Sequence, residues 1–258
     1  MACLVRNLTL FAVALLLAAC NLAITPVTPV QMDLRPTQTP TPPPTQTPTL
    51  QPTFTLAPPT VDPNFFRDEF DGKLEPGWVW MHEVPNQWSL TSVPGSLQID
   101  AGRGYVYLQN IANMLLRPAP VGDFQIETKL TFLPQDNFQF AGLIIYKDEA
   151  NFLQAGHAYC HSGVCVRDGL YLNYYQNGFV VSPNFAQPYT ESAVVFLRLI
   201  RKGAAYIFQM SPDGRVFFTV GEHVSDMEPL QVGLVSGQSV EGEILPALFD
   251  YFAIMSPQ

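Results

Sequence analysis

Alternating apolar and polar positions dominate the second half of the chain. In residues 124–133, Phe124, Ile126, Leu130 and Phe132 fall on one face, and polar side chains occupy most of the other. This period of two predicts a half-buried β-strand. Similar segments predict further strands near residues 95–100, 104–109, 142–147, 153–159, 170–175, 194–202, 205–210, 216–221, 231–236 and 247–255.

Turn-forming residues separate these segments: Asp71-Gly72, Pro94-Gly95, Asn177-Gly178 and Pro212-Asp213-Gly214. The last joins two alternating segments, as expected for a hairpin. No segment after residue 20 sustains the 3.6-residue period of an amphipathic helix. Many short strands in one uninterrupted block, residues 64–258, predict an all-β domain: an antiparallel two-sheet sandwich of jelly-roll type.

An uncharged apolar run covers residues 8–19 and follows Arg6. The run has the length of a secretory signal and is too short to cross a bilayer core of roughly 30 Å. It ends in Leu17-Ala18-Ala19-Cys20, which resembles the lipobox of bacterial lipoproteins. We therefore expect a signal peptide at 1–19, a lipid on Cys20 and attachment to a membrane, with the chain facing the cell surface or periplasm. An ordinary secretory signal, cleaved after a small pair, is the alternative.

Proline and threonine fill the next part of the chain. Residues 21–60 contain 11 Pro and 11 Thr, and the pentapeptide Pro-Thr-Gln-Thr-Pro occurs at 36–40 and again at 44–48. Proline fixes φ and lacks an N–H donor, so this tract predicts a disordered, semi-rigid spacer of about 3.1 Å per residue. Residues 20–63 are thus predicted to be a linker, and 64–258 the folded domain.

The overall charge excludes one class of partner. Charged residues make up only 14% of the chain, and the formal net charge is −9. Residues 64–258 contain 11 basic and 20 acidic side chains, without a basic cluster. Nucleic-acid binding needs a basic surface that displaces counterions from phosphates, so we expect no nucleic-acid partner.

The predicted domain contains one pair of cysteines, Cys160 and Cys165. In an exported domain, this pair predicts a disulfide that closes a hairpin. The neighbouring His157 and His161 raise zinc as an alternative. The spacing does not match a usual zinc pattern, and adjacent residues on a strand point to opposite faces, so the disulfide is favoured.

Several motifs identify a likeness to a known family. They are Phe66-Arg67-Asp68-Glu69-Phe70-Asp71-Gly72, Trp88-Ser89-Leu90, the run at 141–146 with Asp148 and Asn151, Leu197-Arg198-Leu199, and Phe249-Asp250-Tyr251-Phe252. Together they resemble the concanavalin A-like sandwich. More narrowly, they resemble the C-terminal sandwich of family 43 glycoside hydrolases of the β-xylosidase type and related bacterial domains of unknown function. The resemblance specifies the fold better than the function, because this sandwich serves lectins, glucanases and accessory modules alike.

The resemblance also implies a structural calcium ion that joins the first and last strands. Asp68 and Asp250 each lie two residues before an aromatic residue, and so share its strand face. A partly buried carboxylate needs a partner, and calcium prefers oxygen ligands. The alternative is that these carboxylates cap turns or pair with Arg67, Arg198 or Lys202. No other cofactor is expected.

We predict no catalytic residues. Concanavalin A-like glucanases carry a Glu-x-Asp-x-x-Glu string, which places a nucleophile and an acid on one strand face, and this chain lacks it. The acidic residues at 68–71 and 241–243 fit solvated surface better. The histidines have no nearby Gly-x-Ser-x-Gly nucleophile motif.

Glycan binding is therefore the favoured hypothesis. Sugars bind aromatic rings and side-chain amides on the concave sheet of such folds or on its loops. The candidate residues are Tyr105 and Tyr107 on one predicted strand, His157 and Tyr159 on another, and Tyr171 with Asn173 on a third, next to Tyr174 and Tyr175. The ligand would be a glycan or a cell-envelope polymer. A structural or protein-binding lipoprotein is one alternative, and a glycoside hydrolase with an unrecognised acid pair is another.

Overall fold

The computed structural model describes residues 65–161, 165–181, 184–239 and 242–257. The predicted signal peptide, Cys20 and the Pro/Thr-rich linker lie outside these residues and stay predictions. Within the described part, no helix is long and apolar enough to cross a membrane.

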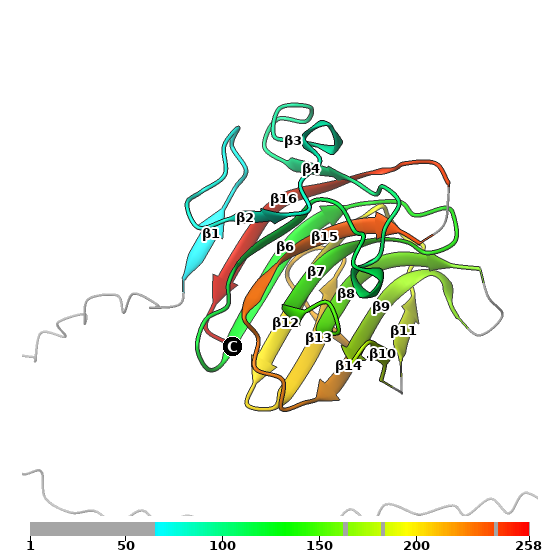
Figure 1. Cartoon of the computed structure of the whole chain (residues 1–258). Coiled ribbons are helices and arrows are strands. Elements are labelled where there is room, and N and C mark those ends of the chain that lie inside the picture. The colour runs from blue at the N-terminus through cyan, green and yellow to red at the C-terminus, as the bar shows by residue number, and fades with distance from the viewer. Residues whose placement is uncertain (1–64, 162–164, 182–183, 240–241, 258) are drawn as a thin grey trace, which may run out of the picture. The chain divides into compact units, whose positions relative to one another are not determined.

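Two antiparallel sheets form the domain (Figure 1), which confirms the predicted all-β sandwich. Sheet A has the order β14 (Phe218–Val224), β13 (Ala205–Ser211), β12 (Val194–Lys202), β6 (Phe124–Thr131), β16 (Pro246–Met255), β4 (Leu97–Asp100) and β3 (Trp88–Ser89), with β1 (Phe66–Asp68) paired to β16. Sheet B has the order β10 (Phe179–Val180), β9 (Arg167–Gln176), β8 (Asn151–Cys160), β7 (Gln139–Asp148), β15 (Gln231–Gln238), β5 (Met114–Pro118) and β2 (Val79–Met81), with β11 (Phe185–Pro188) paired to β9.

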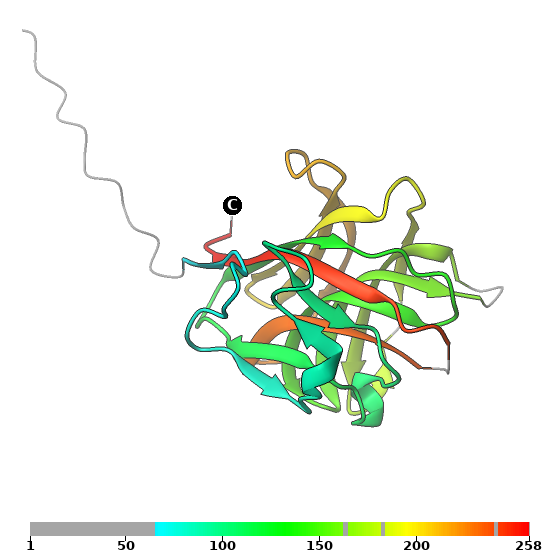
Figure 2. The same cartoon turned by 90° about the horizontal axis from the view of Figure 1, so that it is seen from above.

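The main core lies between the two sheets, which form separate layers when seen from above (Figure 2). The alternation in β6 places Phe124, Ile126 and Leu130 in this core, as predicted. Trp78 packs against the core from its edge, and its ring meets Phe252 at 5.0 Å between centroids. The sheets are therefore joined by burial of apolar side chains, the main source of stability in such a layered fold.

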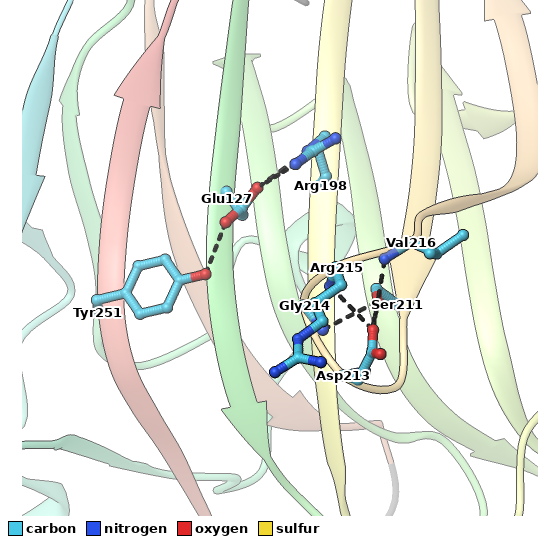
Figure 3. Close-up of polar contacts among 8 residues, drawn as sticks. All are labelled: Glu127, Arg198, Ser211, Asp213, Gly214, Arg215, Val216 and Tyr251. Atoms are coloured by element: carbon cyan, nitrogen blue, oxygen red, sulfur yellow. Dashed lines mark hydrogen bonds and ion pairs between the residues drawn. The ribbon is translucent and has the colours of Figure 1, made fainter.

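The turn at Pro212-Asp213-Gly214 joins β13 and β14, as predicted. Asp213 Oδ1 accepts a hydrogen bond from the backbone N–H of Arg215 at 2.9 Å, and Ser211 Oγ accepts one from Gly214 N at 2.9 Å (Figure 3). The bond from Arg215 is the main reason that the pKa of Asp213 is lowered. These short-range bonds specify the hairpin locally.

The prediction for residues 104–109 was wrong. They form no strand, and residues 106–108 instead make a 3₁₀ helix, η2 (Val106–Leu108), with Gln109 in a left-handed conformation. A second 3₁₀ helix is η1 (Pro85–Gln87). Strand β5 was missed, because Met114, Leu115 and Leu116 are all buried and show no alternation.

Replacing a core aromatic residue tests this account of stability. We expect Phe252→Ala to lower the free energy of unfolding by about 3–5 kcal/mol, because it opens a cavity in the main core. Phe218→Ala removes a ring that is 56% exposed and should change the value by less than about 0.5 kcal/mol. Urea unfolding compares the two, and equal losses would contradict the assigned core.

Candidate functional site

The outer face of sheet B, which faces away from the main core, is apolar. A second cluster of buried side chains covers it, contributed by alternate residues of five strands: Met114, Leu116, Phe140, Ile144, Tyr146, Phe152, Tyr175 and Val235. The intervening Leu143 and Leu153 belong to the main core. Both faces of these strands are therefore apolar, and the outer face must be shielded from water.

Residues 101–113 shield this face, and we call them the covering segment. Tyr105, Val106 and Ile111 pack into the second cluster and are at most 8% exposed. Asn113, at the end of the segment, is fully buried and exchanges two hydrogen bonds with the backbone of Val84. The segment is thus held at its end as well as by its apolar side chains.

Close backbone contacts also hold the covering segment against β15. Gly104 N donates to Gln238 O at 2.8 Å, and Gln238 N donates to Gly102 O at 3.0 Å. A Cβ atom on Gly104 would lie 2.4 Å from the carbonyl oxygen of Asn110 and 2.6 Å from the Cα of Ile111. Only glycine at this position allows the covering segment to fold back so closely on itself.

A pocket of about 170 Å³ stays open beside the covering segment. Alternate residues of β9 line it together with the end of β8, one ring of the covering segment and both cysteines: Tyr105, Phe138, Ala158, Tyr159, Cys160, Cys165, Tyr171, Asn173, Tyr175 and Asn184. Among these described lining residues none carries a charge. An adjoining hollow of about 120 Å³ extends the pocket along Tyr107 and Ser239.

Aromatic rings form a continuous wall of the pocket. Tyr105 and Tyr107 meet edge to face at 5.0 Å, and Tyr107 stacks on Tyr175 at 5.4 Å between centroids. Phe152 stacks behind Tyr175 at 4.5 Å. Burial raises the pKa of Tyr105 and Tyr175, and raises that of Tyr171 to about 12. These hydroxyls are therefore neutral at physiological pH.

Two buried amide oxygens lie beneath the rings. Gln154 of β8 and Asn173 of β9 are directly paired across the strands, and both line a small cavity of about 10 Å³ below the pocket. Neither Gln154 Oε1 nor Asn173 Oδ1 accepts a hydrogen bond from any of the residues that the structure describes. A buried acceptor without a partner is costly, so this pair is the feature of the pocket that most needs a ligand.

Comparison with protein families agrees with the motifs. The family model described as the beta xylosidase C-terminal concanavalin A-like domain matches residues 67–254. The chain belongs to this family. A comparison with curated protein sequences finds no match.

Solved structures similar to this xylosidase-type sandwich confirm its fold. The family 43 BlXynB protein from Bacillus licheniformis matches with a TM-score of 0.67 at 20% identity, over 77% of this chain and 40% of its own. A xylan beta-1,4-xylosidase from Bacillus halodurans matches with a TM-score of 0.62 at 19% identity, over 80% and 41%. A beta-glucanase from Bacillus licheniformis matches at 0.53 and 12% identity, over 75% and 99%. The chain thus covers less than half the length of the two family 43 proteins.

The xylosidase-type sandwich brings together five of the six predicted ligand residues. Tyr105, Tyr159, Tyr171 and Asn173 line the pocket, and Tyr107 lines the adjoining hollow. The rings of Tyr105 and Tyr107 contact each other, although the two residues do not lie in a strand as predicted.

Gln154, Phe138 and Asn184 were not predicted. For Gln154, the sequence offered one indication: a polar amide among the mostly apolar residues 152–158. Phe138 and Asn184 lie outside the strands and gave no such signal.

His157 lies on the other face of β8, in the interior of the domain. Its ring is fully buried next to Tyr189, and Nε2 lies 2.5 Å from Asp168 Oδ1. Burial lowers the pKa of His157, and the carboxylate of Asp168 opposes this effect. His157 is therefore a core residue, which this structure does not place in contact with a ligand in the pocket.

The predicted disulfide between Cys160 and Cys165 is present. Both cysteines line the pocket, where β8 ends. The disulfide therefore closes one side of the candidate site.

Asp68 is buried, and hydrogen bonds already satisfy both of its oxygens. Oδ1 accepts from Phe70 N at 2.9 Å, and Oδ2 accepts from Glu75 N and Trp78 Nε1, both at 2.8 Å. This carboxylate caps a turn, which is the alternative to calcium binding that the sequence left open.

Asp250 has different partners: it is ion-paired with Lys129 and accepts a hydrogen bond from Ser96 Oγ at 3.2 Å. Among the described residues, no group of three or more His, Cys, Asp or Glu side chains could hold a metal. These contacts give no support to a calcium ion shared with Asp68, which stays a prediction.

The outer face of sheet A carries a polar network. Glu127 of β6 accepts hydrogen bonds from Arg198 of β12, at 2.8 and 2.9 Å, and from Tyr251 of β16 at 2.7 Å (Figure 3). The Arg198 guanidinium also lies 3.5 Å above the centre of the Phe217 ring. Both oxygens of Glu127 are thus engaged, and the network ties three strands together.

The buried His157 predicts a dependence of stability on pH. Because its pKa is lower in the folded than in the unfolded state, the unfolded chain binds more protons below about pH 6.5. The free energy of unfolding should fall between pH 7 and pH 5, and His157→Gln should make this fall smaller. His223, whose pKa burial also lowers, contributes to both proteins alike. Equal pH slopes in urea unfolding would show that His157 is not the cause.

Proposed function

We propose that this chain is a surface-anchored, non-catalytic module that binds glycans in the pocket on the outer face of sheet B. The pocket with its aromatic wall and two unpartnered amide oxygens carries this proposal. Aromatic rings pack against the C–H faces of sugars, and buried amides bind their hydroxyl groups. The described lining residues include no carboxylate, so this pocket offers binding rather than acid–base hydrolysis.

Two further observations support the proposal. The family is named for a domain of β-xylosidases, and the similar solved structures include a xylan xylosidase and a glucanase, all of which act on glycans by their names. The lipobox at Cys20 and the Pro/Thr-rich linker would hold the pocket outside the membrane, within reach of cell-envelope or environmental polymers.

A protein-interaction role is the second candidate. The covering segment fills much of the outer face of sheet B, the face on which a long sugar chain would otherwise lie. In-cell cross-linking that captures one specific protein, together with no binding to any saccharide, would favour this candidate.

Binding of the full-length protein to a glycan array and to insoluble polysaccharides tests the main proposal. We expect at least one glycan to bind, and Tyr107→Ala to weaken that binding at least tenfold, because Tyr107 completes the aromatic wall. Phe218→Ala, which removes an exposed ring from sheet A, is the matched control and should bind as the wild type does. Absence of binding to every glycan, or equal binding by both variants, would contradict the proposal.

Labelling of bacteria with a fatty-acid probe tests the anchor. Wild-type protein should be labelled and found with membranes, whereas Cys20→Ser should be unlabelled. Cys3→Ser is the control, because this cysteine lies within the predicted signal peptide and is removed with it. A labelled Cys20→Ser protein would show that the lipid is carried elsewhere, and an unlabelled wild-type protein would show that the signal is an ordinary one.

A further inference from the structure

We propose that the pocket binds the terminal ring of an uncharged glycan, and that one hydroxyl group of this ring donates its hydrogen bond to the paired amide oxygens of Gln154 and Asn173. The inference rests on the proposed glycan-binding function and specifies which part of a glycan is recognised.

The covering segment closes the path that a long sugar chain would need. A chain lying across sheet B would have to pass over β7, β15 and β5, where Ile144, Val235 and Leu116 are already packed beneath Val106 and its neighbours. These side chains are at most 1% exposed. On this side the pocket is therefore a closed end rather than part of a continuous groove.

The size of the pocket fits one ring. Its volume of about 170 Å³, even with the adjoining hollow of about 120 Å³, does not exceed the lower end of the roughly 300–1,000 Å³ of pockets that enclose drug-sized ligands. The small cavity beneath it, about 10 Å³, shares Tyr105, Ala158, Tyr171 and Asn173 with the pocket. Such a space accommodates a group of about the size of a water molecule, which fits one hydroxyl group.

The lining selects an uncharged ligand. The described lining residues have no charged side chain that could pair with a charged sugar, and burying an unpaired charge is strongly unfavourable. The acidic balance of the folded domain further disfavours anionic sugars.

The two amide oxygens require a donor. Gln154 is 5% exposed and lines the small cavity together with Asn173. Among the described residues, its Oε1 is a buried acceptor without a partner, and it belongs to the residue paired directly with Asn173 across the strands. Sugar hydroxyls donate to such acceptors. A site built in this way rejects an analogue that lacks the hydroxyl, because the buried acceptor is then left unpaired.

Calorimetric titration of the full-length protein tests the inference. The probes are methyl glycosides of xylose, arabinose, glucose and galactose, and the corresponding oligosaccharides of two to six units. For the sugar that binds best, we expect the methyl glycoside to bind within threefold of the hexasaccharide. An affinity that rises more than tenfold with chain length would overturn the terminal-ring inference and leave glycan binding intact. Absence of binding by every probe would overturn both.

The role of the amide oxygens has its own test. Gln154→Leu should weaken binding at least tenfold, whereas the matched Gln209→Leu on sheet A should leave it unchanged. Single-deoxy methyl glycosides, titrated against wild-type protein, avoid any folding defect of the variant. One deoxy position should cost at least tenfold and the others less than threefold. Equal binding of all deoxy sugars would overturn recognition through these oxygens.

Discussion

The apolar outer face of sheet B is the constraint on which the rest of the site depends. Strands β5, β7, β8 and β15 bury large apolar side chains on both faces, so the sandwich core alone cannot shield them from water. The covering segment meets this need with Tyr105, Val106 and Ile111. Backbone hydrogen bonds to Gln238 hold it against β15, and its tight fold at Gly104 leaves no room for a side chain there.

The position of the pocket depends on where the covering segment ends. The covering segment shields β5, β15 and much of β7, and leaves the polar pair of Gln154 and Asn173 near the far side of the sheet. There, tyrosines and the Cys160–Cys165 disulfide surround the opening. The same apolar requirement that stabilises the sheet therefore limits the open surface to a small site, which contrasts with the polar network on the outer face of sheet A.

Residues that obey a strict local pattern could be placed from the sequence. Strands β6 and β12 show clear alternation, and the Pro212-Asp213-Gly214 turn makes its own hydrogen bonds. The covering segment could not be predicted from the sequence. In residues 104–109 the tyrosines alternate, which is the pattern of a strand, and only the packing against β15 shows that these residues form none. Tyr171 and Asn173 of β9 could be predicted because alternate residues of a strand share one face. Gln154 becomes a candidate only when the fold places it beside Asn173 on the neighbouring strand. A single sequence does not show which neutral side chains will be paired across neighbouring strands.

The most direct test of the central claim is a crystal structure of the protein soaked with a neutral methyl glycoside that it binds. The account predicts one sugar ring in the pocket beside Tyr171 and Tyr175, with the covering segment in place and a hydroxyl within hydrogen-bonding distance of Gln154 Oε1. A sugar bound on sheet A, or one that lies across β7 and β15 with the covering segment displaced, would contradict it.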